Sequence, residues 1–291
     1  MVDPYSNHLQ LWNGRSPAES LGALTSETAL PFSYEHAHQL AADESLCARE
    51  EKASSTQEPC SLQWFLDIEN LRHKKYGRWI PNVLEFTRHN GETLLGMGPG
   101  LGTDWVQFAR HGASVIVASP TTEHLLLVRR NFELRGLHGQ FLHAPTPDLP
   151  LAPSSIDVVC MNSLPSDPEV RQQTITEVFR ALKPGGKVLA VVPSYYDIEL
   201  WRRWLLPWEH WWIKWRGGSS RPSPSYTRRE LTKVFHQFGE HRVHKRHLRR
   251  ADVPHLWRVL SLSCLERLVG RVLILKAFKP LSTAIQVPMA A

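Results

Sequence analysis

Short apolar segments alternate with amphipathic segments of helical length between residues 92 and 194, and this alternation constrains the fold more than any other feature. The amphipathic segments 102–112 and 122–136 each end at a glycine, which is typical of a helix C-terminus. Strands that alternate with helices form parallel sheets through right-handed crossovers, with helices on both faces. The pattern therefore predicts an α/β fold whose first five strands are residues 92–98, 113–119, 139–145, 156–163 and 187–194.

The remaining segments surround this alternation. A helix is expected over 226–239, with Thr227 as its N-cap and Glu230 completing a capping box. Helical spacing of apolar residues also runs from Trp64 to Phe86, with a break at Pro81, and 167–186 reads as a helix with a Pro-Gly-Gly end. Two more strands are expected, at 240–250 and 268–280.

The predicted organisation has three parts. They are a polar N-terminal extension (1–63), one domain (64–280) that carries a Trp-rich helical insertion and loop (196–225), and a tail (281–291).

Composition excludes several classes of protein. Of the 291 residues, 42% are hydrophobic and 21% are charged, which is typical of a globular chain and not of a disordered or fibrous one. The four cysteines are widely scattered and no two have CxxC spacing, so neither a zinc ribbon nor a dense disulfide scaffold is expected. We expect no metal site, no signal peptide and no membrane-spanning helix, and we interpret the chain as cytoplasmic with reduced thiols.

A glycine-rich turn is the most informative motif. Gly98, Gly100 and Gly102 form a GxGxG pattern between the first expected strand and the helix that follows it. Glycine suits such a turn because the backbone needs angles that a Cβ forbids, and because a ligand can approach the bare main chain at the helix N-terminus. The spacing differs from the GxGxxG of dinucleotide sites, and the Lys-Ser/Thr pair of a P-loop is absent.

Three segments resemble the class I S-adenosylmethionine-dependent methyltransferases, of the type 11-like kind. LLGMGPGLGTDWVQFARHGASVIVAS is similar to the first motif and second strand of that family. LPLAPSSIDVVCMNS resembles the segment that leads into the fourth strand, and EVFRALKPGGKVLAVVPS resembles the segment around the fifth. The resemblance covers about residues 90–195. It implies a Rossmann-like methyltransferase fold with a mostly parallel seven-stranded sheet, S-adenosylmethionine as cofactor, and cofactor contacts at Gly98, Gly100, Gly102 and Ser119.

Three positions depart from the acidic residues that the family commonly has. The residue two places before the glycine motif is Gly96, the residue at the end of the second strand is Ser119, and the residue after the third strand is His143. Loss of a charged contact to the ribose would weaken cofactor affinity roughly 10- to 100-fold unless another group compensates. Asp104 and Asp148 are nearby carboxylates in the sequence.

Two functions therefore remain open. The first is methyl transfer to a small-molecule or lipid-like acceptor. The second is a degenerate methyltransferase fold that serves as a non-catalytic binding or interaction module, with a possible place at the membrane periphery. The sequence assigns no catalytic residue, although His143, Tyr195 and Tyr196 follow expected strands and are candidates for a base.

Six of the eleven tryptophans lie between Trp201 and Trp215, mostly at helical spacing. This segment has three interpretations: ordinary core, a lid over an apolar substrate, or a helix at a membrane interface. The basic run Arg242–Arg250 would support the membrane interpretation, because cations near a membrane surface are attracted to anionic lipid. Binding to nucleic acid is not expected, because no recognised RNA-binding motif is found, and the sequence does not indicate the oligomeric state.

Overall fold

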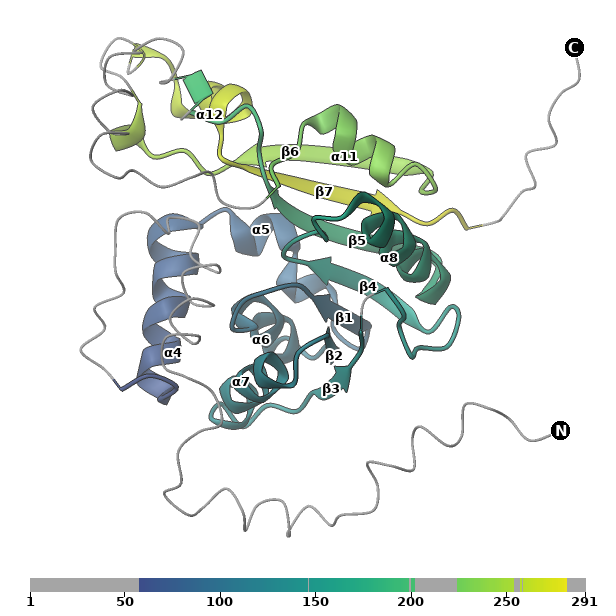
Figure 1. Ribbon diagram of the computed structural model, residues 1–291. Helices are drawn as coiled ribbons and strands as arrows, with labels where there is room; N and C mark the ends of the chain where they lie inside the picture. Colours follow the sequence, from purple (N-terminus) through teal and green to yellow (C-terminus); the bar gives the residue numbers. More distant parts are fainter. Residues whose placement is uncertain are drawn as a thin grey trace, which may run out of the picture. The chain divides into compact units, whose positions relative to one another are not determined.

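The computed structural model describes residues 58–281, apart from residues 146, 199, 202–223, 254–256 and 258 (Figure 1). Most of the predicted N-terminal extension, the C-terminal tail after Leu281 and nearly all of the Trp-rich segment lie outside the described residues. Of the six clustered tryptophans only Trp201 is described.

The centre of the molecule is a seven-stranded sheet in the order β3-β2-β1-β4-β5-β7-β6. The strands β1 to β5 pair in parallel, whereas β7 runs antiparallel to both β5 and β6. The mostly parallel seven-stranded sheet expected from the sequence is therefore confirmed. The strands are β1 (Thr93–Met97), β2 (Ser114–Ser119), β3 (Gln140–His143), β4 (Ile156–Met161), β5 (Leu182–Pro193), β6 (Glu240–Arg246) and β7 (Val272–Phe278).

Both faces of the sheet are buried, and β4 shows this most directly. Val159 and Met161 belong to the apolar cluster on one face, whereas Val158 and Cys160 belong to the cluster on the other. Successive side chains of a strand point to opposite faces, so a continuous apolar run fits a sheet covered on both sides. The first face is covered by α8 (Pro168–Ala181) and α11 (Arg228–Val234), and the second by α5 (Ile80–Leu84), α6 (Thr103–Arg110) and α7 (Thr122–Glu133).

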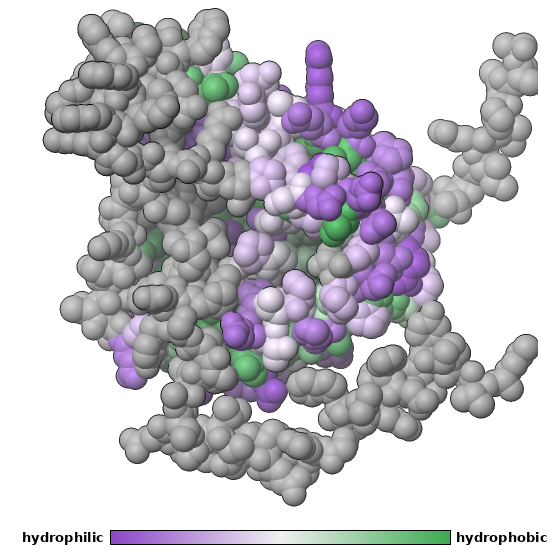
Figure 2. Space-filling model, in the orientation of Figure 1, coloured by the Kyte–Doolittle hydropathy of each residue, from purple (hydrophilic) through white to green (hydrophobic). Residues whose placement is uncertain are grey.

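The outer side of the covering helices is polar. Figure 2 shows hydrophilic side chains over the part of the surface where α8 and α11 lie. On α11 the charged side chains Arg228, Arg229 and Lys233 are exposed, while Leu231 is fully buried. An apolar stripe inward and a charged face outward is the pattern that fixes how an amphipathic helix sits on a sheet.

The segment before β1 is less regular than expected. α4 (Leu62–Glu69) continues into a π-helical turn, η1 (Asn70–Tyr76), and α5 follows after Gly77. Pro81 lies in the first turn of α5, where its missing N–H is harmless, so the expected break falls just before it. A short 3₁₀ turn, η2 (Phe86–Arg88), then leads into β1.

Two boundaries can be compared in detail. The predicted capping box of α11 is present, because Thr227 Oγ1 accepts a hydrogen bond from the Glu230 N–H, and the Glu230 carboxylate accepts one from the Thr227 N–H. The predicted Pro-Gly-Gly end of the preceding helix is wrong, since α8 ends at Ala181 and β5 begins at Leu182. Pro184 disfavours helical angles at Lys183, which explains the earlier helix end.

A small satellite unit follows β6. It contains the 3₁₀ turn η3 (Arg250–Asp252) and α12 (Leu262–Val269), which buries Leu265 and Val269 against Ile198 and Leu248. In the described part of the chain, no helix is long and apolar enough to cross a bilayer.

Candidate functional site

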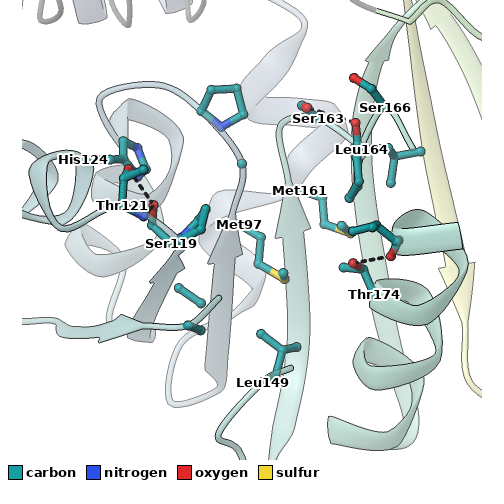
Figure 3. A pocket seen from close by; sticks show the side chains of 17 residues that line it. Met97, Ser119, Thr121, His124, Leu149, Met161, Ser163, Leu164, Ser166 and Thr174 are labelled. Carbon is teal, nitrogen blue, oxygen red and sulfur yellow. Dashed lines mark hydrogen bonds between the residues drawn. The ribbon is translucent and has the colours of Figure 1, made fainter. Parts of the chain in front are cut away.

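A cavity of about 400 Å³ opens at the carboxyl ends of β1, β2 and β4 (Figure 3). This edge is where open α/β sheets bind their ligands. The volume lies within the roughly 300–1,000 Å³ that small-molecule sites occupy. The cavity is lined by Met97, Gly98, Pro99, Ala118, Ser119, Pro120, Thr121, His124, Ala144, Leu149, Met161, Ser163, Leu164, Pro165, Ser166, Val170 and Thr174.

The lining divides into two sides. Ser119, Thr121 and His124, from the end of β2 and the start of α7, lie at one side, and the residues after β4 lie at the other (Figure 3). The side chains of Met97 and Met161 lie between them. These two residues pair across β1 and β4, so the floor of the cavity is apolar.

The glycine turn has the backbone that its sequence predicts. Gly98, Gly100 and Gly102 have φ values of 110°, 121° and 74°, a region that side-chain-bearing residues rarely adopt. Two side chains of α7 hold the turn in place. His124 Nε2 donates to the Gly100 carbonyl at 2.7 Å, and Asn131 Nδ2 donates to the Leu101 carbonyl at 2.8 Å.

The three glycines differ in what surrounds them. Gly98 lines the cavity, and a Cβ there would lie 3.1 Å from the backbone nitrogens of Asn162 and Ser163. A Cβ on Gly102 would lie 2.6 Å from Val128 Cγ1, so this glycine allows α6 to pack closely on α7. Gly100 and Gly102 are not among the residues that line the cavity, so Gly98 is the member of the motif that borders it.

Ser119 lies at the end of β2, is only 4% exposed and lines the cavity. Its Oγ accepts a hydrogen bond from the Thr121 N–H at 3.3 Å and lies 3.5 Å from Thr121 Oγ1. In nucleotide-binding sheets the corresponding place faces the ribose. In place of the carboxylate that the family commonly has at the end of this strand, the cavity therefore has the two neighbouring hydroxyl groups of Ser119 and Thr121.

Position 96 has no room for a larger side chain. A Cβ on Gly96 would lie 2.6 to 2.9 Å from ring atoms of Trp105, which is fully buried. The indole ring therefore fills the space that a larger side chain at position 96 would need.

The two nearby carboxylates noted in the sequence, Asp104 and Asp148, do not line the cavity. Asp104 is completely buried, and its carboxylate accepts hydrogen bonds from Arg72 and, at 2.9 Å, from His73. Burial raises the pKa of Asp104, but Arg72 and His73 outweigh it and hold that pKa well below its usual range. Asp148 is exposed and is not among the residues that line the cavity. Among the described residues that line the cavity, none is Asp, Glu, Lys or Arg.

The three candidate bases also lie outside the lining. His143 is exposed, and its Nε2 donates to the Pro120 carbonyl at 2.9 Å. Tyr195 and Tyr196 are exposed beyond β5 and pack edge to face on each other, with ring centroids 5.1 Å apart. The geometry therefore places none of them at the reacting centre.

The basic run is largely engaged in contacts within the chain. Arg242 pairs with Glu240, Arg246 with Glu266 and Arg249 with Asp252. Lys245 is buried and donates to two backbone carbonyls. Trp201, at the described end of the Trp-rich segment, packs edge to face on Trp257, with ring centroids 6.1 Å apart.

Sequence reasoning missed most of the lining. His124 belongs to no recognisable sequence motif. Leu149 and Thr174 are far from the glycine turn in the sequence and reach the cavity only because of the order of the strands in the sheet. Met97 and Met161 were recognisable only as strand residues. Within the described residues no group of three His, Cys, Asp or Glu side chains is placed to hold a metal ion.

Comparison with known proteins assigns the central segment to a family. Residues 94–190 match the family model described as a methyltransferase domain. A demethylmenaquinone methyltransferase of Clavibacter sepedonicus is 32% identical over 113 residues, which cover 39% of this chain and 46% of that protein. The chain thus matches less than half the length of this curated relative. The family expected from the three motifs is confirmed: residues 94–190 form a methyltransferase domain of the class I, S-adenosylmethionine-dependent kind.

Solved structures resemble the chain at the level of the fold. A SAM-dependent methyltransferase from Methanosarcina mazei is 22% identical with a TM-score of 0.48, and the match covers 69% of this chain and 98% of that one. A SAM-dependent methyltransferase from Aquifex aeolicus is 14% identical with a TM-score of 0.47, covering 75% and 98% respectively.

Proposed function

We propose that this chain, whose residues 94–190 form a methyltransferase domain, transfers a methyl group from S-adenosylmethionine to a small-molecule or lipid-like acceptor. The observation that carries the proposal is the open cavity of about 400 Å³ above the glycine turn. Had side chains of the chain itself filled this space, no adenosyl group would fit there.

The residues present fit the cofactor in three respects. Gly98 offers bare main chain at the cavity wall, and the hydroxyls of Ser119 and Thr121 would be the groups that meet the ribose. The apolar floor of Met97 and Met161 suits a flat heterocyclic base. When bound, the cofactor supplies an activated methyl group on a positively charged sulfur.

Catalysis is proposed to rest on orientation. The described cavity lining offers no carboxylate, and His124 Nε2 is engaged with the Gly100 carbonyl. Holding two reactants in line supplies roughly 7–11 kcal/mol without a catalytic base. This arrangement suits an acceptor whose nucleophilic atom is already electron-rich, with its proton lost to solvent.

The side of the cavity after β4 supports an apolar acceptor. Leu164, Pro165 and Val170 line it, with Ser163 and Ser166 as its polar groups. The name of the Clavibacter relative also indicates a small-molecule acceptor for that protein. We therefore propose an acceptor with a substantial apolar surface.

Calorimetric titration with S-adenosylmethionine and S-adenosylhomocysteine tests the proposal. Gly98→Ala adds a methyl group at the cavity wall and is expected to weaken binding about tenfold or more. Gly136→Ala is the matched control, because Gly136 also has a positive φ but a Cβ there would meet nothing within 4 Å. The control should lose less stability, because only backbone strain is added there, and it should bind as the wild type does.

The alternative is a methyltransferase fold that has lost its cofactor and serves as a binding module. The specific observation in its favour is the absence of charged groups from the described lining. No heat and no thermal shift at millimolar S-adenosylmethionine would overturn the enzyme proposal and leave this alternative.

A further inference from the structure

The ribose side of the cavity is neutral where nucleotide sites commonly carry an acid. In sheets of this kind a carboxylate roughly 20 residues after the glycine turn accepts hydrogen bonds from ribose hydroxyls. Ser119, at the end of β2, holds that place here.

The two hydroxyls are fixed in position. Ser119 is 4% exposed, and its Oγ lies within 3.3 Å of the Thr121 N–H and 3.5 Å of Thr121 Oγ1. Both residues line the cavity on the side away from β4 (Figure 3). They form a compact pair of neutral groups that can donate as well as accept.

No charged group in the described lining replaces the missing acid. Position 96 is closed to any side chain by Trp105, and the Asp104 carboxylate is held by Arg72 away from the cavity. Recognition of the ribose therefore falls to the hydroxyl pair.

We propose that Ser119 and Thr121 form a neutral ribose site, and that Ser119 sets how strictly this chain selects for an intact ribose. The wild-type cavity accepts adenosyl ligands that lack one ribose hydroxyl, which a carboxylate at the same place would reject. This inference rests on the proposed cofactor site, and it adds the ligand selectivity of that site.

The expected effects follow from hydrogen-bond strengths. A hydrogen bond between neutral groups contributes about 2- to 10-fold in affinity, and one to a charged group about 10- to 150-fold. Removal of one ribose hydroxyl should therefore weaken binding to the wild type by about tenfold at most. With an acid in place the same removal should cost more than tenfold.

The structure also indicates that an acid is tolerated at position 119. The helix α7 begins at Thr122, and its N-cap Thr121 makes no side-chain capping hydrogen bond. The uncapped N–H groups and the helix dipole favour a negative charge nearby.

The experiment measures the affinities of S-adenosylhomocysteine and of its 2′-deoxy and 3′-deoxy analogues by calorimetry. The variants are Ser119→Asp, Ser119→Asn, which has the same shape without the charge, and Ser114→Asp, which adds the charge at the exposed start of the same strand. Thermal unfolding without ligand verifies that each variant is folded. Ser119→Asp should bind S-adenosylhomocysteine about 10- to 100-fold more tightly and discriminate against a deoxy analogue. The other two variants should keep wild-type selectivity.

Two results would overturn the inference alone. One is that the wild type binds S-adenosylhomocysteine, but its affinity falls far more than tenfold when either ribose hydroxyl of the ligand is removed. The other is a folded Ser119→Asp variant with wild-type affinities for all three ligands. Failure of the wild type and of Ser119→Asp to bind any of them would instead overturn the proposed function, and the inference with it.

Discussion

The indole ring of Trp105 occupies the space beside Gly96, so that a Cβ at position 96 would lie 2.6 Å from Trp105 Cδ2. Trp105 is fully buried on α6, and Gly96 lies inside β1 between two paired strands, so neither backbone can move away easily. The glycine at this position is therefore part of how α6 packs on the sheet.

Substitution of Gly96 should destabilise the fold. Because Gly96 does not have a positive φ, the effect of Gly96→Ala is steric, and overpacking of this kind costs about 1–3 kcal/mol. Urea denaturation measures the free energy of unfolding. The double variant Gly96→Ala/Trp105→Leu should show strong coupling, because the smaller side chain removes the clash. Additive effects of the two changes would contradict the packing explanation.

The glycine turn should loosen when its anchor on α7 is removed. Asn131 is fully buried, donates to the Leu101 carbonyl and does not line the cavity. Asn131→Leu removes this hydrogen bond and the one that Asn131 Oδ1 accepts from Arg135 Nε, which should cost about 1–3 kcal/mol and weaken S-adenosylhomocysteine binding severalfold. Asn82→Leu, at an exposed position of α5, is the control and should change neither quantity. A destabilised Asn131→Leu with wild-type affinity would show that the turn does not depend on this contact.

Most of the fold could be predicted from the sequence because its signals are local. Apolar runs such as residues 187–194 and glycines after helices are visible without knowledge of any distant contact, and the sheet they predict is the one observed. The predicted end of α8 was too late in the sequence. Pro184 disfavours helical backbone angles at the preceding residue, so the helix ends earlier and β5 begins earlier than predicted.

The site was less predictable because its residues meet only through the sheet order. The positive φ of Gly98 follows from the motif, but the pairing of Met97 with Met161 requires β1 and β4 to be neighbours. The engagement of Asp104 by Arg72 joins residues 32 positions apart and involves a π-helical turn that no local pattern indicated. Such contacts decide which carboxylates are available, and the sequence alone does not reveal them.

The buried pair of Arg72 and Asp104 should make stability sensitive to acid. The pKa of Asp104 is held below its ordinary value of 3.8 in the folded state. Its stabilising contribution is therefore fully present above about pH 5 and is lost as the pH falls through and below the unfolded value. Asp104→Asn should cost about 3–5 kcal/mol at pH 7, because it removes the carboxylate that pairs with the buried Arg72 guanidinium.

Denaturation curves of the wild type and Asp104→Asn between pH 3 and pH 7 measure this difference. The difference should narrow toward pH 3, because the Asp104 carboxyl of the unfolded wild type binds protons there that the folded wild type does not. Asp67→Asn on α4 is a control on a half-buried carboxylate whose contact is with the exposed Gln63 side chain. If the difference in the free energy of unfolding between wild type and Asp104→Asn did not change with pH, Asp104 would not have a lowered pKa in the folded state.

Lys245 should also make stability rise with pH, but in the alkaline range. This β6 lysine is 6% exposed, and its Nζ donates to the carbonyls of Tyr196 and Leu268. Burial, together with the nearby Arg228, lowers the pKa of Lys245 from 10.5 to about 8. Between these values the unfolded chain binds the proton that the folded chain has lost, so this group makes the protein more stable as the pH rises from 8 to 10.5.

Unfolding of the wild type and Lys245→Met at pH 7.5 and pH 9.5 tests this dependence. The free energy of unfolding of the wild type should rise relative to that of the variant at the higher pH. Lys233→Met, on the exposed face of α11, serves as the control and should follow the wild type at both values. A constant difference between wild type and Lys245→Met would mean that the buried ammonium keeps its proton throughout this range.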